Sequence, residues 1–281
     1  MKSKYINKIK LNIQLLILRT IVRLPYPLLI ALGNNAGLTL MIFSKKAREK
    51  VKEKIARQCP HLTDEEHDKL NKECFKNRGM EFIELGIAAF WPDHRIKRWF
   101  EIIGLENLSS SDTGVFLLIP SFFSMEIAMR TINIYHPTIG TYSSHSYSSS
   151  TSLLSHARYR IHKHVIGQGN IHLLTNILKN RGTLCYPLIN EEMSKDDIFS
   201  SQETSPTLIR ESVVSIIMNV AQPILTIVSP QKKSGYGYQI RIRPPRNHFP
   251  YGNHRLSDEY IRKLIKDEIN RSPEKYKYLT D

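Results

Sequence analysis

Short apolar runs that alternate with segments of helical spacing constrain the fold of this chain more than any other feature. Residues 114–120, GVFLLIP, form a continuous apolar run typical of a strand buried on both faces. Similar runs occupy residues 138–142, 183–189, 223–228 and 238–242, and helical spacing occupies residues 122–134, 152–162, 171–180 and 207–220. This alternation predicts an α/β fold with a mixed central sheet flanked by helices.

Local signals place further elements around that alternating region. Thr63 is followed three residues later by Glu66, the form of a capping box, which predicts the start of a long helix. Another helix is predicted over residues 257–271. Arg241 and Arg243 alternate with isoleucines in the last apolar run, so we expect a strand at the sheet edge or one exposed on a single face.

The positive charge of the chain is concentrated at its beginning. The whole chain has 40 Lys and Arg against 26 Asp and Glu, a formal net charge of +14. Residues 1–60 contain 13 of these basic residues and only 2 acidic ones. A basic terminal segment interleaved with apolar residues favours an anionic lipid surface as partner, and the sequence shows no nucleic-acid-binding motif.

The apolar stretch over residues 11–43 is not a clean transmembrane helix. Its interruptions are Arg19, Arg23, Pro25, Pro27, Asn34 and Asn35. The length of the stretch, its internal arginines and the basic run after it argue against a cleaved signal peptide. We expect residues 1–60 to form a helical segment that lies in the membrane interface or inserts part-way, followed by an α/β domain over residues 61–281. The alternative is a pair of buried core helices with a solvated basic face.

The sequence predicts no bound metal or cofactor. Cys59, Cys74 and Cys185 lie far apart, without the spacing of a zinc site or a disulfide framework. Phosphate-binding loops and dinucleotide fingerprints are also missing from the sequence.

Several pieces of sequence, in a fixed order over most of the chain, carry a family resemblance. They are LPY at 24–26, CPHLT at 59–63, FIEL at 82–85, EIIGLE at 101–106, RYR at 158–160, PP at 244–245, FP at 249–250 and PEKY at 273–276. In these pieces the chain resembles the late acyltransferases of lipid A biosynthesis, the lauroyl and myristoyl transferases of Gram-negative bacteria. The resemblance implies a glycerolipid acyltransferase-like fold, an acyl carrier protein thioester as donor and a glycolipid hydroxyl as acceptor.

The catalytic signature of that family is a histidine, four residues and then an acid, where a strand ends and a helix begins. At this place the chain reads SFFSME, from Ser121 to Glu126. The resemblance implies that the imidazole removes the proton of the acceptor hydroxyl while the acid orients the ring. Glu126 fills the place of the acid, although an acid at a helix start is also favoured by the helix dipole. Ser121 replaces the histidine, and a serine hydroxyl does not accept a proton near neutral pH, so roughly 10²–10⁴ in rate should be lost.

Other residues extend this candidate site. Four histidines of the following α/β units are candidates for a relocated base: His145, His156, His162 and His164. The resemblance directs Arg158 and Arg160 towards acceptor phosphates, with a solvated helix face as the alternative. Phe122 and Phe123 are candidates for the lining of an acyl-chain tunnel, with simple core packing as the alternative. The loops at 142–146 and 188–192 also depart from the family pattern.

Three functional hypotheses follow from these residues. The first is a membrane-associated member of the lipid A acyltransferase family, on the cytoplasmic face of a bacterial inner membrane. The second is a catalytically inactive relative that binds a lipid, an acyl carrier or a partner enzyme. The third is an acyltransferase for another acceptor that uses a relocated base. The sequence leaves open whether the protein is an enzyme, because the residue at position 121 is the one that separates the three.

Overall fold

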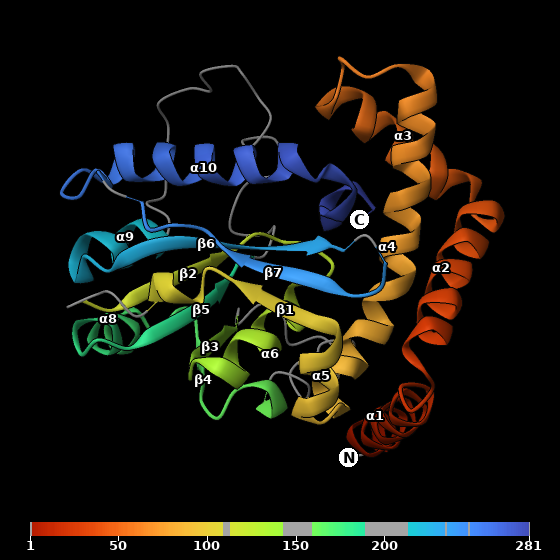
Figure 1. Cartoon of the computed structure of the whole chain (residues 1–281), viewed down its shortest axis with the longest axis horizontal. Coiled ribbons are helices and arrows are strands. Elements are labelled where there is room, and N and C mark those ends of the chain that lie inside the picture. Colours follow the sequence, from red (N-terminus) through yellow and green to blue (C-terminus); the bar gives the residue numbers. More distant parts are fainter. Residues whose placement is uncertain are drawn as a thin grey trace.

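A seven-stranded sheet forms the centre of the part of the chain that is described in the computed structural model, residues 2–108, 113–142, 159–188, 213–233, 235–246 and 248–280 (Figure 1). The strand order is β1-β7-β6-β2-β5-β3-β4. All neighbouring pairs are parallel except β6 with β7. The strands are β1 Phe100–Ile103, β2 Val115–Ile119, β3 Ile139–Tyr142, β4 Val165–Gly167, β5 Thr183–Pro187, β6 Ile224–Lys232 and β7 Tyr238–Ile242.

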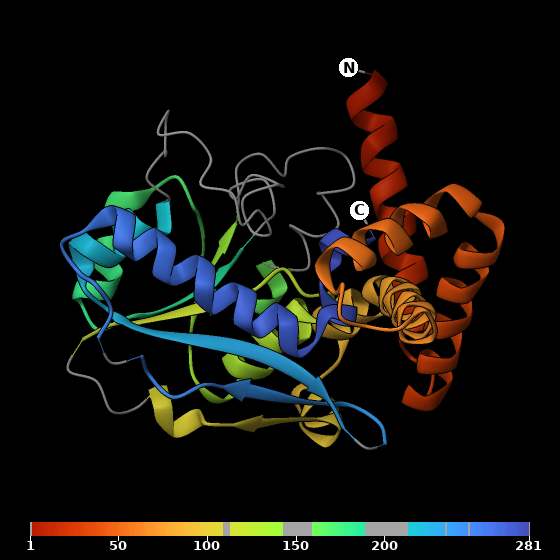
Figure 2. The same cartoon turned by 90° about the horizontal axis from the view of Figure 1, so that it is seen from above.

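Helices cover both faces of this sheet. They are α1 Lys2–Ile21, α2 Tyr26–Phe43, α3 Lys45–Gln58, α4 Asp64–Phe90, α5 Asp93–Trp99, α6 Met125–Tyr135, α8 Ile171–Lys179, α9 Val213–Ala221 and α10 His254–Arg271, with short 3₁₀ helices η1 Leu105–Leu108, η3 Pro273–Lys275 and η4 Lys277–Leu279. One core packs α1, α2, α4 and α6 against the sheet, and the other packs α3, α8, α9 and α10 (Figure 2). Strand β2 contributes alternate side chains to both, which explains its continuous apolar sequence.

The predicted α/β fold is confirmed, with differences in detail. All five predicted strands are present, and the capping box forms as expected: the Thr63 hydroxyl accepts from the Glu66 N–H at 3.3 Å, and the Glu66 carboxylate accepts from the Thr63 N–H at 2.8 Å. Strands β1 and β4 were not predicted. Of the two alternatives predicted for β7, the edge position does not hold, because β1 pairs with its outer side. Its single exposed face is confirmed, since Gln239 and Arg241 alternate with buried neighbours. The division of the chain at residue 60 stays a prediction.

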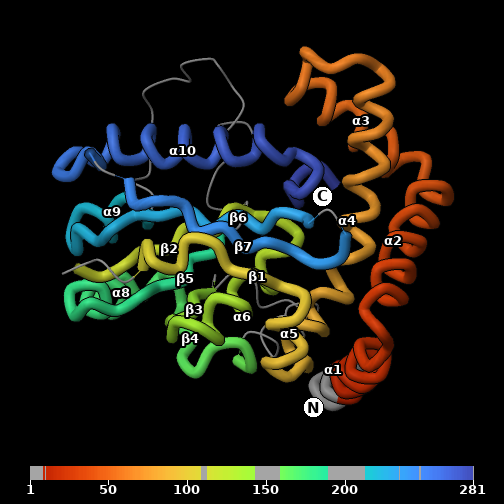
Figure 3. The backbone as a smooth tube through the Cα atoms, in the orientation of Figure 1, coloured from red at the N-terminus to blue at the C-terminus, as the bar shows by residue number. Residues whose placement is uncertain are grey.

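Helices α2 and α4 pack with their backbones in contact (Figure 3). Three glycines make this approach possible. A Cβ added at Gly79 would lie 2.1 Å from the carbonyl oxygen of Gly33, and one added at Gly37 would lie 2.0 Å from the carbonyl oxygen of Phe75. Helix α2 therefore lies along α4, whose sequence carries many charged residues.

The outer surfaces of α1 and α2 are apolar. Their exposed large apolar side chains are Ile9, Ile13, Leu16 and Ile17 on α1 and Leu28, Leu32, Leu40, Ile42 and Phe43 on α2. Helix α2 has the length and composition to cross a membrane, which for one helix near the N-terminus is weak evidence. We call these nine side chains the apolar face. A soluble domain rarely leaves so many large apolar side chains together in water, so the face requires a covering.

Candidate functional site

The Ser121–Glu126 segment forms the junction between strand β2 and helix α6. Strand β2 lies inside the sheet and pairs in parallel with β6 and β5. Its carboxyl end therefore lies near the middle of the edge formed by the carboxyl ends of these strands. The chain turns at residues 121–124, and α6 begins at Met125. Ser121 and Glu126 are 7% and 4% exposed, and Glu126 lies in the first turn of α6. The carboxyl edge of an open α/β sheet is where such folds place their ligand sites.

The C-terminal segment of the chain holds this turn in place. The Phe123 N–H donates to the carbonyl of Lys275, and the Lys277 N–H donates to the carbonyl of Ser121, each at 3.0 Å. Phe122 forms an isolated antiparallel bridge with Tyr276. Residues 275–277 therefore pair with the turn much as a neighbouring strand would. These main-chain hydrogen bonds fix the backbone at Ser121 independently of its side chain.

A buried carboxyl lies directly behind the turn. Glu84 of α4 is 1% exposed, and its Oε1 accepts a hydrogen bond from the Tyr238 hydroxyl at 2.6 Å. Burial raises the pKa of Glu84 to about 7, and hydrogen bonds from Tyr238 and Ser124 oppose that rise. Ser124 is the residue that precedes α6, so this network joins α4 and β7 to the junction.

A buried amine lies on the C-terminal side of the same turn. Lys275 is 4% exposed, and its Nζ donates to the carbonyl of Pro230 on β6 at 2.8 Å. Burial lowers the pKa of this lysine. Two buried ionisable residues therefore hold the turn from different elements: Glu84 through the Ser124 side chain, and Lys275 through its main-chain carbonyl.

Of the predicted substrate-binding residues, the two phenylalanines lie in the interior. Phe122 is fully buried and joins the core of α3, α8, α9 and α10, and Phe123 is 2% exposed. Arg160 lies on the surface with its guanidinium carbon 5.2 Å from the centre of the Phe90 ring. Arg158 lies outside the described residues. The roles assigned to these four residues stay predictions.

Two of the candidate replacement bases lie at the amino ends of the strands, whereas Ser121 lies at a carboxyl end. The Nδ1 of His162 lies 3.2 Å from the hydroxyl of Thr138, and the His164 carbonyl accepts from the Gly140 N–H, both at the amino end of β3. Since β3 runs parallel to β5, and β5 to β2, about five residues of strand separate them from the level of Ser121, roughly 16 Å. His145 and His156 lie outside the described residues.

Sequence reasoning missed a buried amide at the same edge as Ser121. Gln168 is 1% exposed, and its Nε2 donates to the carbonyl of Pro187 at 2.9 Å. Pro187 pairs with Ile119, two residues before Ser121. No strand was predicted before Gln168, because β4 has only three residues. Glu84 and Lys275 were missed for another reason: both lie in the family-like segments, but nothing in the sequence indicated that those segments meet.

The family model and the related sequences agree on one family. Residues 2–281 match the family model described as bacterial lipid A biosynthesis acyltransferase. The lipid A biosynthesis palmitoleoyltransferase of Escherichia coli K12 is 30% identical over 265 residues, covering 92% of this chain and 85% of that protein. The lauroyltransferase of the same strain is 25% identical over 267 residues, covering 94% of this chain and 87% of its own.

A solved structure also shows a distant likeness. The 1-acyl-sn-glycerophosphate acyltransferase of Thermotoga maritima overlaps 87% of this chain and 96% of its own, with 9% sequence identity and a TM-score of 0.38.

Proposed function

Because this chain belongs to the bacterial lipid A biosynthesis acyltransferase family, we propose that it acts at the cytoplasmic face of a bacterial inner membrane on an acyl carrier protein thioester and a lipid hydroxyl. The observation that carries the proposal is the junction itself. Ser121 and Glu126 occupy a braced turn at the carboxyl end of β2, and the family signature belongs at such a place. The apolar face supports the membrane part, because lipid would cover it.

The residue at position 121 limits the chemistry that this site can perform. The transferred acyl group leaves the thioester sulfur when the acceptor oxygen attacks, and the acceptor must lose its proton for that attack. The Ser121 hydroxyl does not take up this proton, and neither His162 nor His164 is within reach. We therefore propose that acyl transfer is slower here than in a relative with the histidine, by roughly 10²–10⁴.

The same residue favours a second candidate function. A site that keeps its braced turn and its acid while its proton acceptor is replaced is suited to binding an acyl thioester, a lipid or a partner enzyme without chemistry. In this case Ser121 leaves the binding surface intact and removes only the reaction.

Acyl transfer by four forms of the full chain tests the two functions. We would incubate the natural protein and the variants Ser121→His, Ser121→Asn and Glu126→Ala with labelled acyl carrier protein thioester and lipid A precursors in detergent micelles. Restoring the imidazole should raise turnover by roughly 10²–10⁴, whereas the amide of Asn, which is polar but not basic, should leave it unchanged.

The outcomes separate the candidates. Turnover in the natural protein that collapses in Glu126→Ala supports slow acyl transfer. No turnover in the natural protein, together with turnover in Ser121→His, supports a binding role on a retained framework. Silence from all forms, with thioester binding also undetectable, would contradict both.

A further inference from the structure

The C-terminal segment that holds the Ser121 turn is itself anchored to helix α4. Asn77 is 3% exposed, and its Nδ2 donates to the carbonyl of Glu274 at 2.7 Å. Four residues further along α4, the Glu81 carboxylate forms an ion pair with the Nζ of Lys277 at 2.6 Å. Because residues four apart lie on the same side of a helix, one face of α4 holds both ends of residues 274–277.

The residues between these two anchors are the ones that contact the turn. The Lys275 carbonyl accepts from the Phe123 N–H, and the Lys277 N–H donates to the Ser121 carbonyl. Lys277 therefore uses its main chain for the turn and its side chain for α4. A continuous path of polar contacts leads from α4 to the backbone of Ser121 and Phe123.

Helix α3 adds a contact directly after Lys277. The Nζ of Lys54 donates to the carbonyl of Tyr278 at 2.6 Å and lies 4.1 Å from the centre of the Tyr278 ring. The C-terminal segment is thus held before and after its contact with the turn.

The bond from Asn77 explains why an asparagine occupies this place. Asparagine is one of the weaker helix formers and is mostly found on protein surfaces. Asn77 nevertheless lies buried in the interior of α4, where leucine would favour the helix more. A leucine would leave the Glu274 carbonyl without this donor, so the position is suited to holding the C-terminal segment.

The same stretch of α4 also carries helix α2. Gly79 lies between Asn77 and Glu81, and a Cβ added there would lie 2.1 Å from the Gly33 carbonyl oxygen. Helix α2 carries part of the apolar face. Helix α4 therefore sets the position of the turn relative to the apolar face. For a reaction on a lipid this position matters, because small misplacements of reacting groups cost large factors in rate.

We propose that Asn77 and Glu81 are positioning residues for the Ser121 turn and act on it through residues 274–277. They fix the main chain at Ser121 and Phe123 and do not contact the substrate. The effect on acyl transfer rests on the proposed function. The effect on the turn does not.

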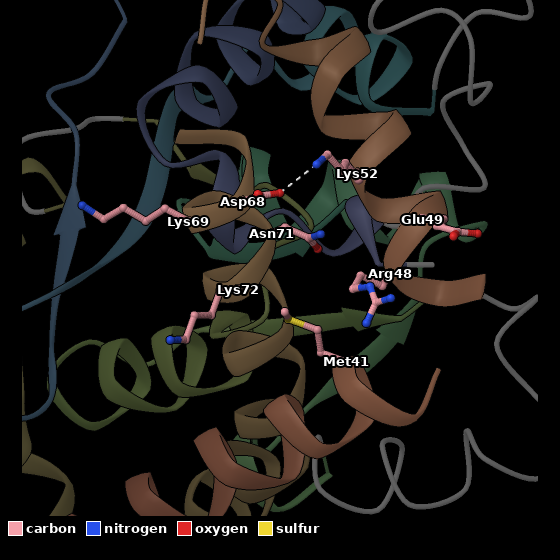
Figure 4. A pocket seen from close by; sticks show the side chains of 8 residues that line it. All are labelled: Met41, Arg48, Glu49, Lys52, Asp68, Lys69, Asn71 and Lys72. Atoms are coloured by element: carbon pink, nitrogen blue, oxygen red, sulfur yellow. Dashed lines mark hydrogen bonds and ion pairs between the residues drawn. The ribbon is translucent and has the colours of Figure 1, made fainter. Parts of the chain in front are cut away.

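Hydrogen exchange in the full chain tests the effect on the turn. Asn77→Leu removes the donor at nearly constant volume, and Glu81→Gln removes the charge. Asp68→Asn is the matched control. It breaks the 2.9 Å ion pair of Asp68 with Lys52, which also joins α4 to α3 but lies in a surface cleft of about 630 Å³ (Figure 4). Asp68 precedes Asn77 by nine residues, roughly 13 Å along the helix.

We would follow the Phe123 and Lys277 amides by nuclear magnetic resonance, with amides of strand β5 as the reference for the whole fold. Both amides should exchange about tenfold faster in Asn77→Leu, which loses a buried hydrogen bond, and about threefold faster in Glu81→Gln, which loses a half-exposed ion pair. The control should exchange like the natural protein. Unchanged exchange at these two amides, or an equal increase in β5, would overturn the proposal.

An exchange of charges tests the effect on acyl transfer. In the Ser121→His form, Glu81→Lys and Lys277→Glu each place like charges together. Each should lower kcat about tenfold and leave KM unchanged, because the reacting groups are misaligned while the binding groups are untouched. The double variant forms the ion pair with reversed signs and should recover kcat. A double variant as slow as the single variants would contradict the positioning role.

The two readouts keep this proposal separate from the proposed function. If Ser121→His transfers no acyl group, the proposed function fails, and hydrogen exchange in the same charge variants still decides the positioning role. Faster exchange at Phe123 and Lys277 in both single variants, reversed in the double variant, would support it. Equal exchange in all three variants would refute it.

Discussion

At the residue scale, the main chain positions Ser121, and buried ionisable groups support it. Its carbonyl accepts from the Lys277 N–H, a bond that any residue at position 121 can make. Glu84 reaches the turn through its hydrogen bond with Ser124, whereas Lys275 holds it through its main-chain carbonyl and anchors its own Nζ on the carbonyl of Pro230. Burying ionisable groups beside this turn costs desolvation free energy. The free energy of unfolding should therefore depend measurably on pH.

Glu84 makes the stability of the protein fall as the pH rises. Burial raises its pKa to about 7 from an ordinary value of 4.5, so between these values the folded protein holds a proton that the unfolded chain has released. The free energy of unfolding therefore decreases across this range because of Glu84 and levels off above it. Glu84→Gln should remove that decrease. Urea denaturation of both proteins across this pH range measures it, and Glu65→Gln, at an exposed position of α4, is the control. The same slope in Glu84→Gln and the natural protein would contradict the assignment.

At the element scale, the contact between α2 and α4 depends on glycine. Helix α2 has few large side chains on its inner face, and Gly33 and Gly37 let its backbone reach α4 at Gly79. The close packing keeps the outer side of α2 turned away from the core.

Gly79→Ala should therefore separate α2 from α4. The added methyl would lie 2.1 Å from the Gly33 carbonyl oxygen, a backbone atom that cannot turn aside. We expect a loss of about 1–3 kcal/mol in the free energy of unfolding, the usual cost of overpacking. Gly169→Ala is the matched control, because nothing lies within 4 Å of its added Cβ. Chemical denaturation of both variants measures the difference. A Gly79→Ala protein as stable as the control would show that the helices are not held this closely.

Sequence reasoning worked best where an element carries its own signal. The Thr63–Glu66 capping box and the apolar run of β2 were recognisable because neighbouring residues define them. Strand β1 was missed because four residues with mixed burial give no clear periodicity, and without β1 the sequence could not tell whether β7 lies at the edge of the sheet.

The site was predictable only along one stretch of chain. The Ser121–Glu126 motif and its place after a strand were predicted from local sequence. Its support was not, since Glu84 precedes it by about forty residues and Lys275 follows it by about one hundred and fifty. Contacts of that separation depend on the path of the whole chain and leave no local pattern.

At the scale of the whole molecule, the apolar face lies on α1 and α2, within the group of helices α1 to α4 that stands beside the sheet (Figure 1). Helices α8, α9 and α10 show only scattered exposed apolar side chains such as Leu256. The described part of the molecule is thus asymmetric, with one group of helices suited to a lipid surface.

Polar substitution on α2 should weaken membrane binding without unfolding the protein. Leu28 and Leu32 are 52% and 48% exposed, so replacing both with Gln removes little core packing. Each loses about 1.5–3 kcal/mol of burial in the membrane interface. Co-sedimentation with membranes should therefore fall well over tenfold. Leu256→Gln, at a position of α10 that is 49% exposed, is the control and should sediment like the natural protein. Unchanged sedimentation of the α2 variant would contradict the membrane role of the apolar face.

The bond between Ser121 and Lys277 also sets an order of events during synthesis. Helices α1 to α4 are translated before Ser121, whereas the segment that clamps the turn is translated about one hundred and fifty residues after Ser121. In a nascent chain the helices that carry the apolar face therefore precede the Ser121 turn, and the hydrogen bonds that fix this turn form only after residues 275–277 have been translated.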